Sequence, residues 1–300
     1  MKIGIKRINR VTITSTVVLT AGAVLASGAF ASAAQAATAP PAPSIVAKGG
    51  FVMNSGTGKA LYSKTADTRR STGSTTKIMT ALVVLKQKNV NLKSQVTIQK
   101  AYSDYIVSKN ASSARLIVGD KVTVGQLLYG LMLPSGCDAA YALADKFGTG
   151  KTRDARVKSF IGQMNSTAKS LKLKNTNFDS FDGIGSGKNY STPRDLTIIA
   201  REAMKNSTFR TVVKTKSTKQ TVTMKNGGKR VMSWANTNKM LSSYSGAIGV
   251  KTGSGPTAKY CLVFAATRNG KTVIGTVLTS TNESTRTADA KKLMDYGFKR

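Results

Sequence analysis

A serine and a lysine three positions apart are the residues best suited to covalent chemistry in this chain. Ser74-Thr75-Thr76-Lys77 opens a stretch of helically spaced apolar residues, which predicts a helix over about residues 75–87. On a helix this spacing puts the Lys77 amine one turn from the Ser74 hydroxyl, on the same face. The chain contains no histidine. A Ser-His-Asp triad is therefore excluded, and lysine is the known substitute base for a serine nucleophile.

The same four-residue pattern occurs again at Ser166-Thr167-Ala168-Lys169, so the pattern alone is weak evidence. Ser74 is expected at a helix N-terminus, where unpaired backbone N–H groups can stabilise an oxyanion. Ser166 is expected within a charged helix over residues 151–171, on a face exposed to solvent. Without companion motifs, the simplest role of Ser74 would be that of a helix N-cap.

Two further segments supply such companions. Pro134-Ser135-Gly136-Cys137-Asp138 lies in a turn between expected helices at 122–133 and 138–147, where a side chain can point into a cleft. Lys251-Thr252-Gly253 ends an expected strand at 247–252, and Ser254-Gly255-Pro256 is expected to turn the chain away. Such a strand can present a cation, a hydroxyl and backbone donors to a carboxylate. The three segments together indicate a serine enzyme with a lysine base.

The elements that must position these segments follow from the hydropathy pattern. Short apolar runs at 45–53 and 59–63 predict a β-hairpin, residues 175–190 predict a loop, and Pro193 begins a helix. Strands are expected at 260–267 and 272–280, joined by a tight turn at Arg268-Asn269-Gly270, before a last helix at 284–296.

This order of elements predicts an α/β (α+β) fold. An antiparallel sheet from about 45–75 and 210–300 would be flanked by helices, and an all-helical region would cover about 76–209. At 300 residues and 40% hydrophobic composition, the chain can bury a large core.

The three motifs resemble those of penicillin-recognising serine enzymes. More narrowly, the chain is similar to the low-molecular-mass penicillin-binding proteins, the serine D-alanyl-D-alanine carboxypeptidases and DD-transpeptidases, with a Ser-Gly-Cys second motif. The resemblance covers about residues 45–280 and includes 131–136, 191–196 and 234–238. It implies a β-lactamase/transpeptidase-like fold, peptidoglycan stem peptides ending in D-Ala-D-Ala as substrates, and β-lactam antibiotics as inhibitors. No cofactor and no metal are expected.

The resemblance also implies roles for individual residues. Ser74 would attack the carbonyl between two D-alanines, and Lys77, as a neutral amine favoured by a neighbouring cation, would take its proton. Ser135 would relay a proton to the leaving amine. Lys251-Thr252-Gly253 would bind the terminal carboxylate of the peptide. The backbone N–H groups of Ser74 and Ser254 would form the oxyanion hole, at about 3 kcal/mol per donor.

Cys137 departs from the usual second motif, which has Asn at this position. An Asn amide can donate a hydrogen bond to the acyl side chain of the substrate, whereas a thiol donates only weakly. We therefore expect slow acylation and a preference for an amine acceptor over water. The alternative is that Cys137 is a small packing residue without catalytic effect. Cys137 and Cys261 are expected as free thiols, and two cysteines cannot build a tetrathiolate zinc site or an iron–sulfur cluster.

Three other functions share parts of this pattern. A serine β-lactamase of the corresponding class uses a glutamate in a loop before the third motif, but the only glutamate in that span, Glu202, falls in an expected helix. A DD-endopeptidase performs the same reaction on a cross-link. A non-catalytic, basic cell-wall-binding protein would keep the motifs without being labelled by penicillin.

Gly148–Thr152 suggests a phosphate loop, but Asp145 stands where that motif requires glycine.

Residues 1–36 have the layout of a secretory signal peptide: a basic start, an apolar stretch at 11–31 and a small-residue site at Ala34-Gln35-Ala36. An uncleaved membrane anchor is the alternative. The mature chain, residues 37–300, would be a single exported domain, secreted or peripherally associated with the membrane or cell wall.

The chain is strongly basic, with 46 Lys and Arg against 13 Asp and Glu and a net charge of +33. Removing residues 1–36 takes away four basic and no acidic residues, which lowers the charge from +33 to +29. This charge suits an anionic cell-wall or membrane surface as a partner, or it simply keeps the chain soluble. Export and the small number of aromatic residues argue against nucleic acid as a partner.

Overall fold

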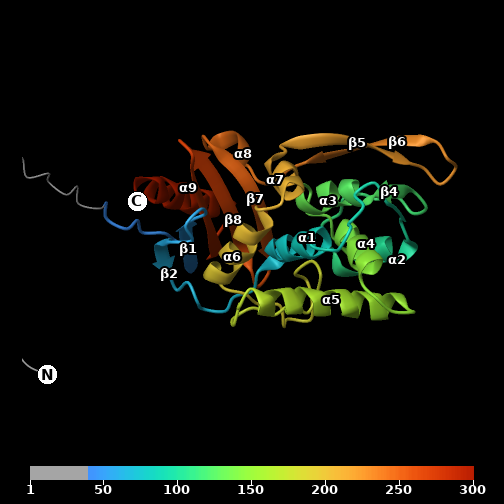
Figure 1. The fold of residues 1–300 in the computed structure, drawn as a ribbon, viewed down its shortest axis with the longest axis horizontal. Helices are drawn as coiled ribbons and strands as arrows, with labels where there is room; N and C mark the ends of the chain where they lie inside the picture. The colour runs from blue at the N-terminus through green and yellow to red at the C-terminus, as the bar shows by residue number, and fades with distance from the viewer. Residues whose placement is uncertain (1–39) are drawn as a thin grey trace, which may run out of the picture. The chain divides into compact units, whose positions relative to one another are not determined.

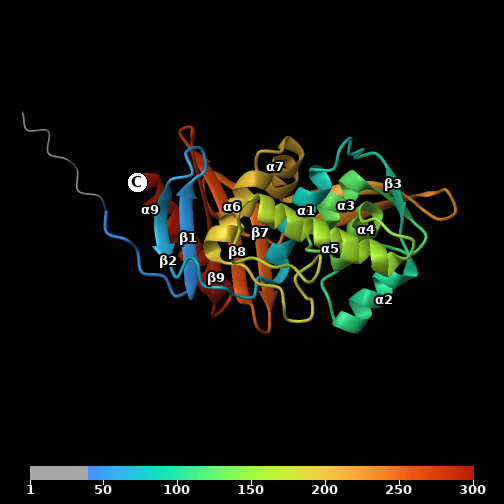
Figure 2. The same ribbon diagram turned by 60° about the horizontal axis from the view of Figure 1, so that its bottom comes forward.

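The structure, a computed structural model, describes residues 40–300. The expected signal peptide at 1–36 lies outside the described residues. Figures 1 and 2 show a sheet-centred region and a mainly helical region lying next to each other. The predicted class, an antiparallel sheet flanked by helices plus a helical region, is confirmed.

The central element is a five-stranded antiparallel sheet of order β2-β1-β9-β8-β7. Its strands are β1 (Gly49–Asn54), β2 (Ala60–Lys64), β7 (Ala247–Gly255), β8 (Lys259–Arg268) and β9 (Lys271–Ser280). Successive side chains of a strand point to opposite faces. Accordingly Val52 packs with residues of α9 (Glu283–Lys299), whereas Phe51 and Met53 join the core shared with α6 (Pro193–Ala203). Helices α9 and α6 therefore pack on opposite faces of the sheet.

The helical region is built around α1 (Lys77–Leu85), which is almost wholly buried. Around it lie α2 (Lys100–Lys109), α3 (Val124–Met132), α4 (Cys137–Phe147), α5 (Arg153–Ser170) and α7 (Ser207–Lys214). Local sequence explains where several of these helices begin. Thr123 and Gln126 form a capping box at α3, and Thr152 and Thr192 cap α5 and α6. Pro193 is the first residue of α6, as predicted.

The predicted division into a sheet region and an all-helical region was wrong in one respect. A second antiparallel sheet joins β3 (Gln95–Thr97), β4 (Lys121–Thr123), β5 (Ser217–Thr223) and β6 (Lys229–Ala235). The β5–β6 hairpin thus packs on the helical region and not in the main sheet. The physical reason is its inward face, where Val222, Met232 and Trp234 are buried in the core of the helices.

Several local predictions are confirmed and two boundaries differ. Asn269 and Gly270 have positive φ values of 47° and 75°, as a tight turn between β8 and β9 requires. Helix α2 was not predicted, because among its residues only Tyr102 is buried and its apolar periodicity is weak. The strand carrying Lys251 extends to Gly255, so the chain turns at 256–258 and not at Ser254. In the described part of the chain, no helix is both long and apolar enough to cross a membrane.

Candidate active site

The three predicted motifs meet at one cavity of about 580 Å³. Ser74 enters it from the turn before α1, Ser135 and Cys137 from the start of α4, and residues 252–255 from β7. These segments are separated by about 60 and 115 positions along the chain. The structure therefore brings together every residue that the sequence placed in the site, with Lys77 and Lys251 buried directly behind the lining.

The Lys77 amine nitrogen lies 2.8 Å from the Ser74 hydroxyl oxygen. Ser74 belongs to a short 3-10 helix, Gly73–Thr76, and α1 begins only at Lys77, so Ser74 and Thr75 both precede the α-helix that was expected to begin at residue 75. Gly73 has a φ of 49°, and a Cβ there would lie 2.9 Å from the Ser254 carbonyl oxygen. Glycine at this position therefore allows the serine turn to approach β7 closely.

Lys77 is fully buried and has two further neighbours. Its amine nitrogen lies 3.3 Å from the Cys137 sulfur and 3.3 Å from the Asp182 carbonyl oxygen. Burial raises the pKa of the Cys137 thiol, and this effect outweighs the opposing effect of Lys77. Cys137 is therefore a neutral thiol at neutral pH, suited to packing and weak hydrogen bonding.

Ser135 occupies the turn between α3 and α4, as predicted, and is largely buried. Its φ of 67° lies in the left-handed region, which is uncommon for residues other than glycine. Its backbone carbonyl accepts a 2.6 Å hydrogen bond from the Ser112 hydroxyl. The backbone N–H of Cys137 donates to the Ser112 carbonyl at 2.8 Å. The second motif is thus attached to a neighbouring loop that the sequence did not reveal.

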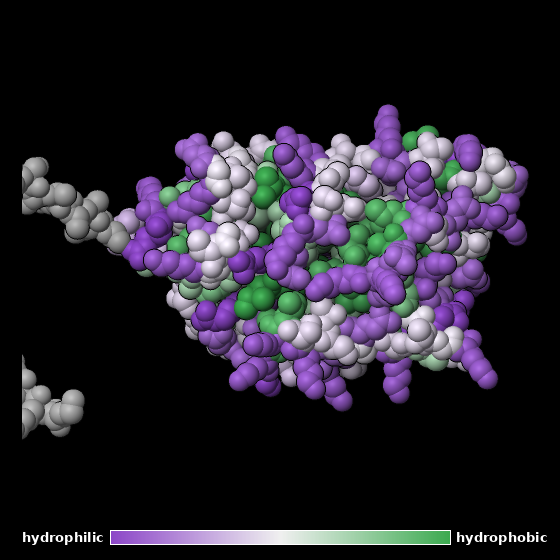
Figure 3. Space-filling view, in the orientation of Figure 1, coloured by the Kyte–Doolittle hydropathy of each residue, from purple (hydrophilic) through white to green (hydrophobic). Residues whose placement is uncertain are grey.

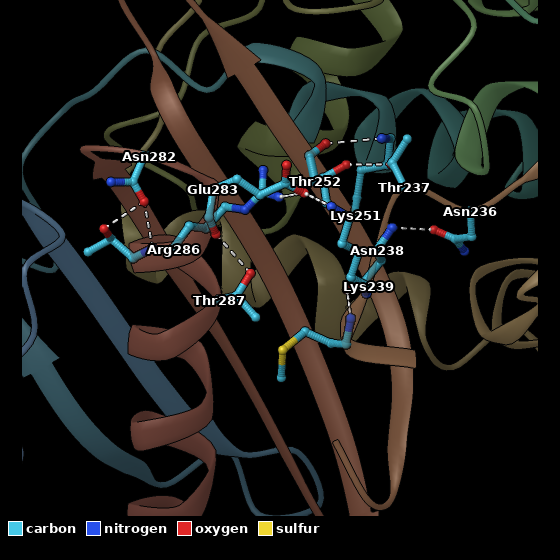
Figure 4. A network of polar contacts seen from close by, with 12 residues as sticks. Asn236, Thr237, Asn238, Lys239, Lys251, Thr252, Asn282, Glu283, Arg286 and Thr287 are labelled. Atoms are coloured by element: carbon cyan, nitrogen blue, oxygen red, sulfur yellow. Dashed lines mark hydrogen bonds and ion pairs between the residues drawn. The ribbon is translucent and has the colours of Figure 1, made fainter. Parts of the chain in front are cut away.

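Lys251 is 1% exposed, and its amine donates to the Thr252 carbonyl at 3.0 Å. Burial, and then the nearby Lys77 amine, hold the pKa of Lys251 well below its ordinary value. The Thr252 hydroxyl lies 2.6 Å from the Thr237 hydroxyl, which also borders the cavity (Figure 4). Gly253 passes close to the serine turn, because a Cβ there would lie 2.8 Å from the Thr72 carbonyl oxygen.

The structure adds a cation that the sequence analysis missed. Arg286, in the first turn of α9, is 5% exposed and borders the cavity. One guanidinium nitrogen donates to Glu283 at 3.1 Å, whereas the buried Nε has no hydrogen-bond partner (Figure 4). Burial lowers the pKa of Arg286. No local motif marks this arginine, because its relevance depends on α9 packing beside β8 and β9.

Asp182 is the second residue missed, and it lies in the loop over residues 175–190. Its carboxylate accepts hydrogen bonds from the Tyr105 hydroxyl at 2.9 Å and from the Ile184 N–H at 2.9 Å. Next to it, Gly183 has a φ of 96° and approaches Gly73 so closely that no Cβ would fit. The backbone of this loop therefore packs directly against the turn at Gly73–Thr76, and the Asp182 carbonyl lies within hydrogen-bond distance of Lys77.

The two competing patterns lie away from the cavity. Ser166 and Lys169 lie in α5 and do not border the cavity. Thr152, the last residue of the suggested phosphate loop, caps α5 by accepting a hydrogen bond from the Ala155 N–H.

Cys137 and Cys261 are both buried free thiols. Within residues 40–300, no three His, Cys, Asp or Glu side chains cluster as metal ligands would.

Comparison with known proteins agrees with this geometry. The chain is 72% identical over 264 residues to a D-alanyl-D-alanine carboxypeptidase of Streptomyces sp. (strain K15), which covers 87% of this chain and 90% of that protein. It is 32% identical over 253 residues to the carboxypeptidase DacF of Bacillus subtilis (strain 168) and spans 62% of that protein.

A solved structure shows the same fold at high identity. The crystal structure of the Streptomyces K15 DD-transpeptidase superposes with a TM-score of 0.86 at 72% identity, over 86% of this chain and 99% of that one. The family model Peptidase_S11, D-alanyl-D-alanine carboxypeptidase, matches residues 33–282. Because this match covers more than half of the chain, the chain belongs to the Peptidase_S11 family of D-alanyl-D-alanine carboxypeptidases.

Proposed function

We propose that this protein is a penicillin-sensitive serine DD-transpeptidase and D-Ala-D-Ala carboxypeptidase that acts through an acyl-enzyme at Ser74. The observation that carries this proposal is the 2.8 Å contact between the Ser74 hydroxyl and the fully buried Lys77 amine, in the cavity shared with the other two motifs. A neutral amine at this distance can accept the hydroxyl proton directly.

Acylation forms an ester bond at Ser74 and breaks the peptide bond between the two D-alanines. The Ser74 oxygen attacks the carbonyl carbon of the penultimate D-alanine, and its proton passes to Lys77. The C–N bond to the terminal D-alanine then breaks, and the leaving amine takes a proton through Ser135. The products are an ester at Ser74 and free D-alanine. Ser74 and Ser254 both line the cavity, and their N–H groups are proposed to stabilise the oxyanion.

The terminal carboxylate of the peptide is proposed to bind between β7 and α9. Lys251 has no carboxylate partner among the described residues, and Arg286 keeps a buried, unpartnered Nε beside the cavity. Thr252, in contact with Thr237, adds a hydroxyl donor. Buried cations that lack full partners are costly in the free enzyme, so a carboxylate that supplies the missing hydrogen bonds is bound strongly.

The balance between transfer and hydrolysis is proposed to depend on Cys137. An acyl-enzyme ester leaves Ser74 when either water or an amine attacks it. A neutral thiol beside Lys77 is a weaker hydrogen-bond donor to the acyl group than an amide. We therefore assign a preference for an amine acceptor.

The rival functions differ from this one in testable ways. Glu202, the only candidate deacylating glutamate, lies in α6 and pairs with Lys86 and Lys205, and it does not border the cavity. Rapid β-lactam hydrolysis is therefore not expected. A DD-endopeptidase would use the same residues on a cross-linked peptide. Measuring turnover of a cross-linked peptide beside that of a linear D-Ala-D-Ala peptide distinguishes the two activities.

Export and surface binding form a separate proposal. Residues 1–36 are proposed to be a cleaved signal peptide that exports residues 37–300. Hydrophilic residues surround the face shown in Figure 3, with apolar patches near its centre, and the mature chain would carry +29. Peripheral attachment to an anionic membrane or cell-wall surface is therefore proposed. Co-sedimentation with anionic and neutral vesicles or cell-wall material, at low and high salt, tests it. Equal binding to neutral vesicles, or binding that salt does not weaken, would contradict it.

Labelling by a β-lactam tests the catalytic proposal. Intact-mass measurement should show a single adduct on the wild type that is absent in Ser74→Ala. The matched control is Ser166→Ala, which removes the serine of the second Ser-x-x-Lys pattern and should keep the adduct. No adduct on the wild type would overturn the enzyme assignment and favour a non-catalytic cell-wall-binding protein.

A further inference from the structure

A buried carboxylate organises the wall of the cavity that carries Ser135 and Cys137. Asp138, the second residue of α4, is 2% exposed. Its two oxygens accept hydrogen bonds from Ser113 Oγ at 2.7 Å, Ala114 N at 2.8 Å, Leu116 N at 3.1 Å and Ala139 N at 2.9 Å. Three of these donors belong to the segment over residues 112–116, between α2 and β4. Asp138 therefore joins that segment to the start of α4.

The carboxylate is balanced by hydrogen bonds and not by a counter-ion. No Lys or Arg of residues 40–300 forms an ion pair with Asp138. A buried anion is tolerated when several donors surround it, and its place at the N-terminus of α4 adds the favourable helix dipole. Loss of the carboxylate would leave the N–H groups of Ala114 and Leu116 without their acceptor. The conformation of segment 112–116 thus depends on Asp138.

The same segment reaches the second motif through Ser112. The Ser112 hydroxyl donates to the Ser135 carbonyl at 2.6 Å and lies 3.5 Å from the Cys137 sulfur. The Ser112 carbonyl accepts the Cys137 N–H at 2.8 Å. Ser135 adopts a left-handed backbone, which persists in a residue other than glycine only when its surroundings hold it there. The hydrogen bond from Ser112 restrains Ser135 in this conformation.

Close packing on both sides leaves this wall little freedom to shift. A Cβ on Gly136 would lie 2.7 Å from the Ala114 nitrogen, so the backbone at Gly136 packs directly against the backbone of segment 112–116. From the other side, the Trp234 indole donates to the Ala114 carbonyl at 2.8 Å. A displacement of segment 112–116 is therefore transmitted to Ser135.

We propose that Asp138 and Ser112 are positioning residues for acyl transfer. Asp138 holds segment 112–116 in place, and Ser112 transmits its position to Ser135. This inference rests on the proposed function, in which Ser135 passes a proton to the leaving amine. Proton transfer requires the donor within hydrogen-bond distance of the acceptor, and a displacement of about 1 Å costs about a hundredfold in rate. Substrates whose leaving group needs no proton should be insensitive to the pair.

The first test compares two substrates that share one acyl group. One is a peptide ending in D-Ala-D-Ala, and the other is a thioester whose thiolate leaves without a proton. Ser112→Ala should lower kcat on the peptide by about tenfold or more and on the thioester by less than about threefold. Ser112→Thr keeps the hydroxyl and should restore peptide turnover. Ser108→Ala is the control, because that exposed hydroxyl bonds only the Tyr105 carbonyl.

The second test separates positioning from stability. Asp138→Asn and Asp145→Asn each alter a buried carboxylate of α4, but Asp145 contacts Tyr102, Arg153 and Arg156 at the far end of the helix. Both variants should lower the Tm, and only Asp138→Asn should lose peptide turnover selectively at a temperature well below its Tm. Equal losses on peptide and thioester, or a Ser112→Ala enzyme like the wild type, would overturn the proposal. A wild type inactive on both substrates would overturn the proposed function, and this proposal with it.

Discussion

The sulfur of Cys137, which borders the cavity, lies 3.3 Å from the buried amine nitrogen of Lys77. The same lysine contacts the Ser74 hydroxyl on its other side. Because burial raises the pKa of the thiol, Cys137 presents a neutral S–H to this lysine and not a thiolate. The lysine proposed as the base is therefore bordered by a weak hydrogen-bond donor.

Replacement of this thiol should change the fate of the acyl-enzyme. We expect Cys137→Asn to raise the ratio of hydrolysed to transferred product several-fold, because the amide can donate a hydrogen bond to the acyl side chain. Chromatographic separation of both products, with and without an added amine acceptor, measures the ratio. Cys261→Ser is the control, since that buried thiol lies in β8 and donates to the Ala258 carbonyl. Hydrolysis dominating in the wild type under both conditions would contradict the expected preference.

Removal of the base while its positive charge is kept should abolish acylation. The guanidinium introduced by Lys77→Arg stays protonated and cannot take the proton of Ser74. The rate of β-lactam adduct formation should fall by about 10²–10⁴-fold. Lys169→Arg makes the same change in the second Ser-x-x-Lys pattern and should leave the rate unchanged. A Lys77→Arg enzyme within about threefold of the wild type would show that another group accepts the proton.

The buried amine of Lys251 should lower the free energy of unfolding of this protein at neutral and acidic pH. Its pKa is depressed by burial and by Lys77, so the unfolded state binds the proton more tightly than the folded state does. The cost is complete below the lowered folded pKa and disappears as the pH rises towards about 10.4, the ordinary lysine value. Lys251→Met should therefore be more stable near pH 6 by about 1 kcal/mol or more. That gain corresponds to a Tm about 2–4 °C higher per kcal/mol.

The Tm difference between Lys251→Met and the wild type should shrink as the pH approaches 10, and thermal melts across this range measure it. The same variant should bind the carboxylate-terminated substrate poorly. Lys239→Met, which removes a largely exposed cation, controls for the general loss of one charge. A Lys251→Met protein that is less stable than the wild type at pH 6 would mean that the buried amine is adequately solvated or paired.

Arg286 should act on the terminal carboxylate and not on the chemical step. Arg286→Gln is expected to raise KM about tenfold or more for a peptide ending in a carboxylate, because a charged hydrogen bond is lost. It should change KM little for the same peptide with an amidated C-terminus. Lys239→Gln is the matched control, since Lys239 contacts Glu283 from outside the cavity, at 3.6 Å. Equal effects on the two peptides would assign Arg286 a structural role.

The local pattern predicted the contact between Ser74 and Lys77 because the two residues are one helical turn apart. Ser74 and Lys77 needed no distant contact to be placed side by side, although the 3-10 turn that carries Ser74 was not anticipated. Apolar periodicity and turn residues likewise located most helices of the described residues and the strands β1, β2, β8 and β9. The missing histidine excluded imidazole catalysis on composition alone.

Contacts between distant segments could not be obtained in that way. The pairing of β5 with β4, the approach of α9 to β7 and the placing of Arg286 depend on which buried faces pack together. The attachment of Ser135 to Ser112 and of Lys77 to the Asp182 carbonyl has the same origin. Each joins residues more than 20 positions apart, and many arrangements of the chain satisfy the local pattern equally well.

The amino-acid sequence by itself predicted the chemistry proposed for this protein: a serine nucleophile, a lysine base and a lysine-bearing strand for an anionic substrate end. The tertiary structure alone decided the environment of those groups. Only the packed fold buries Lys77 and Lys251 near each other, places a neutral thiol against Lys77 and brings α9 to the edge of the cavity. Burial and charge proximity are properties of segments brought together by the hydrophobic core, and no local pattern encodes them.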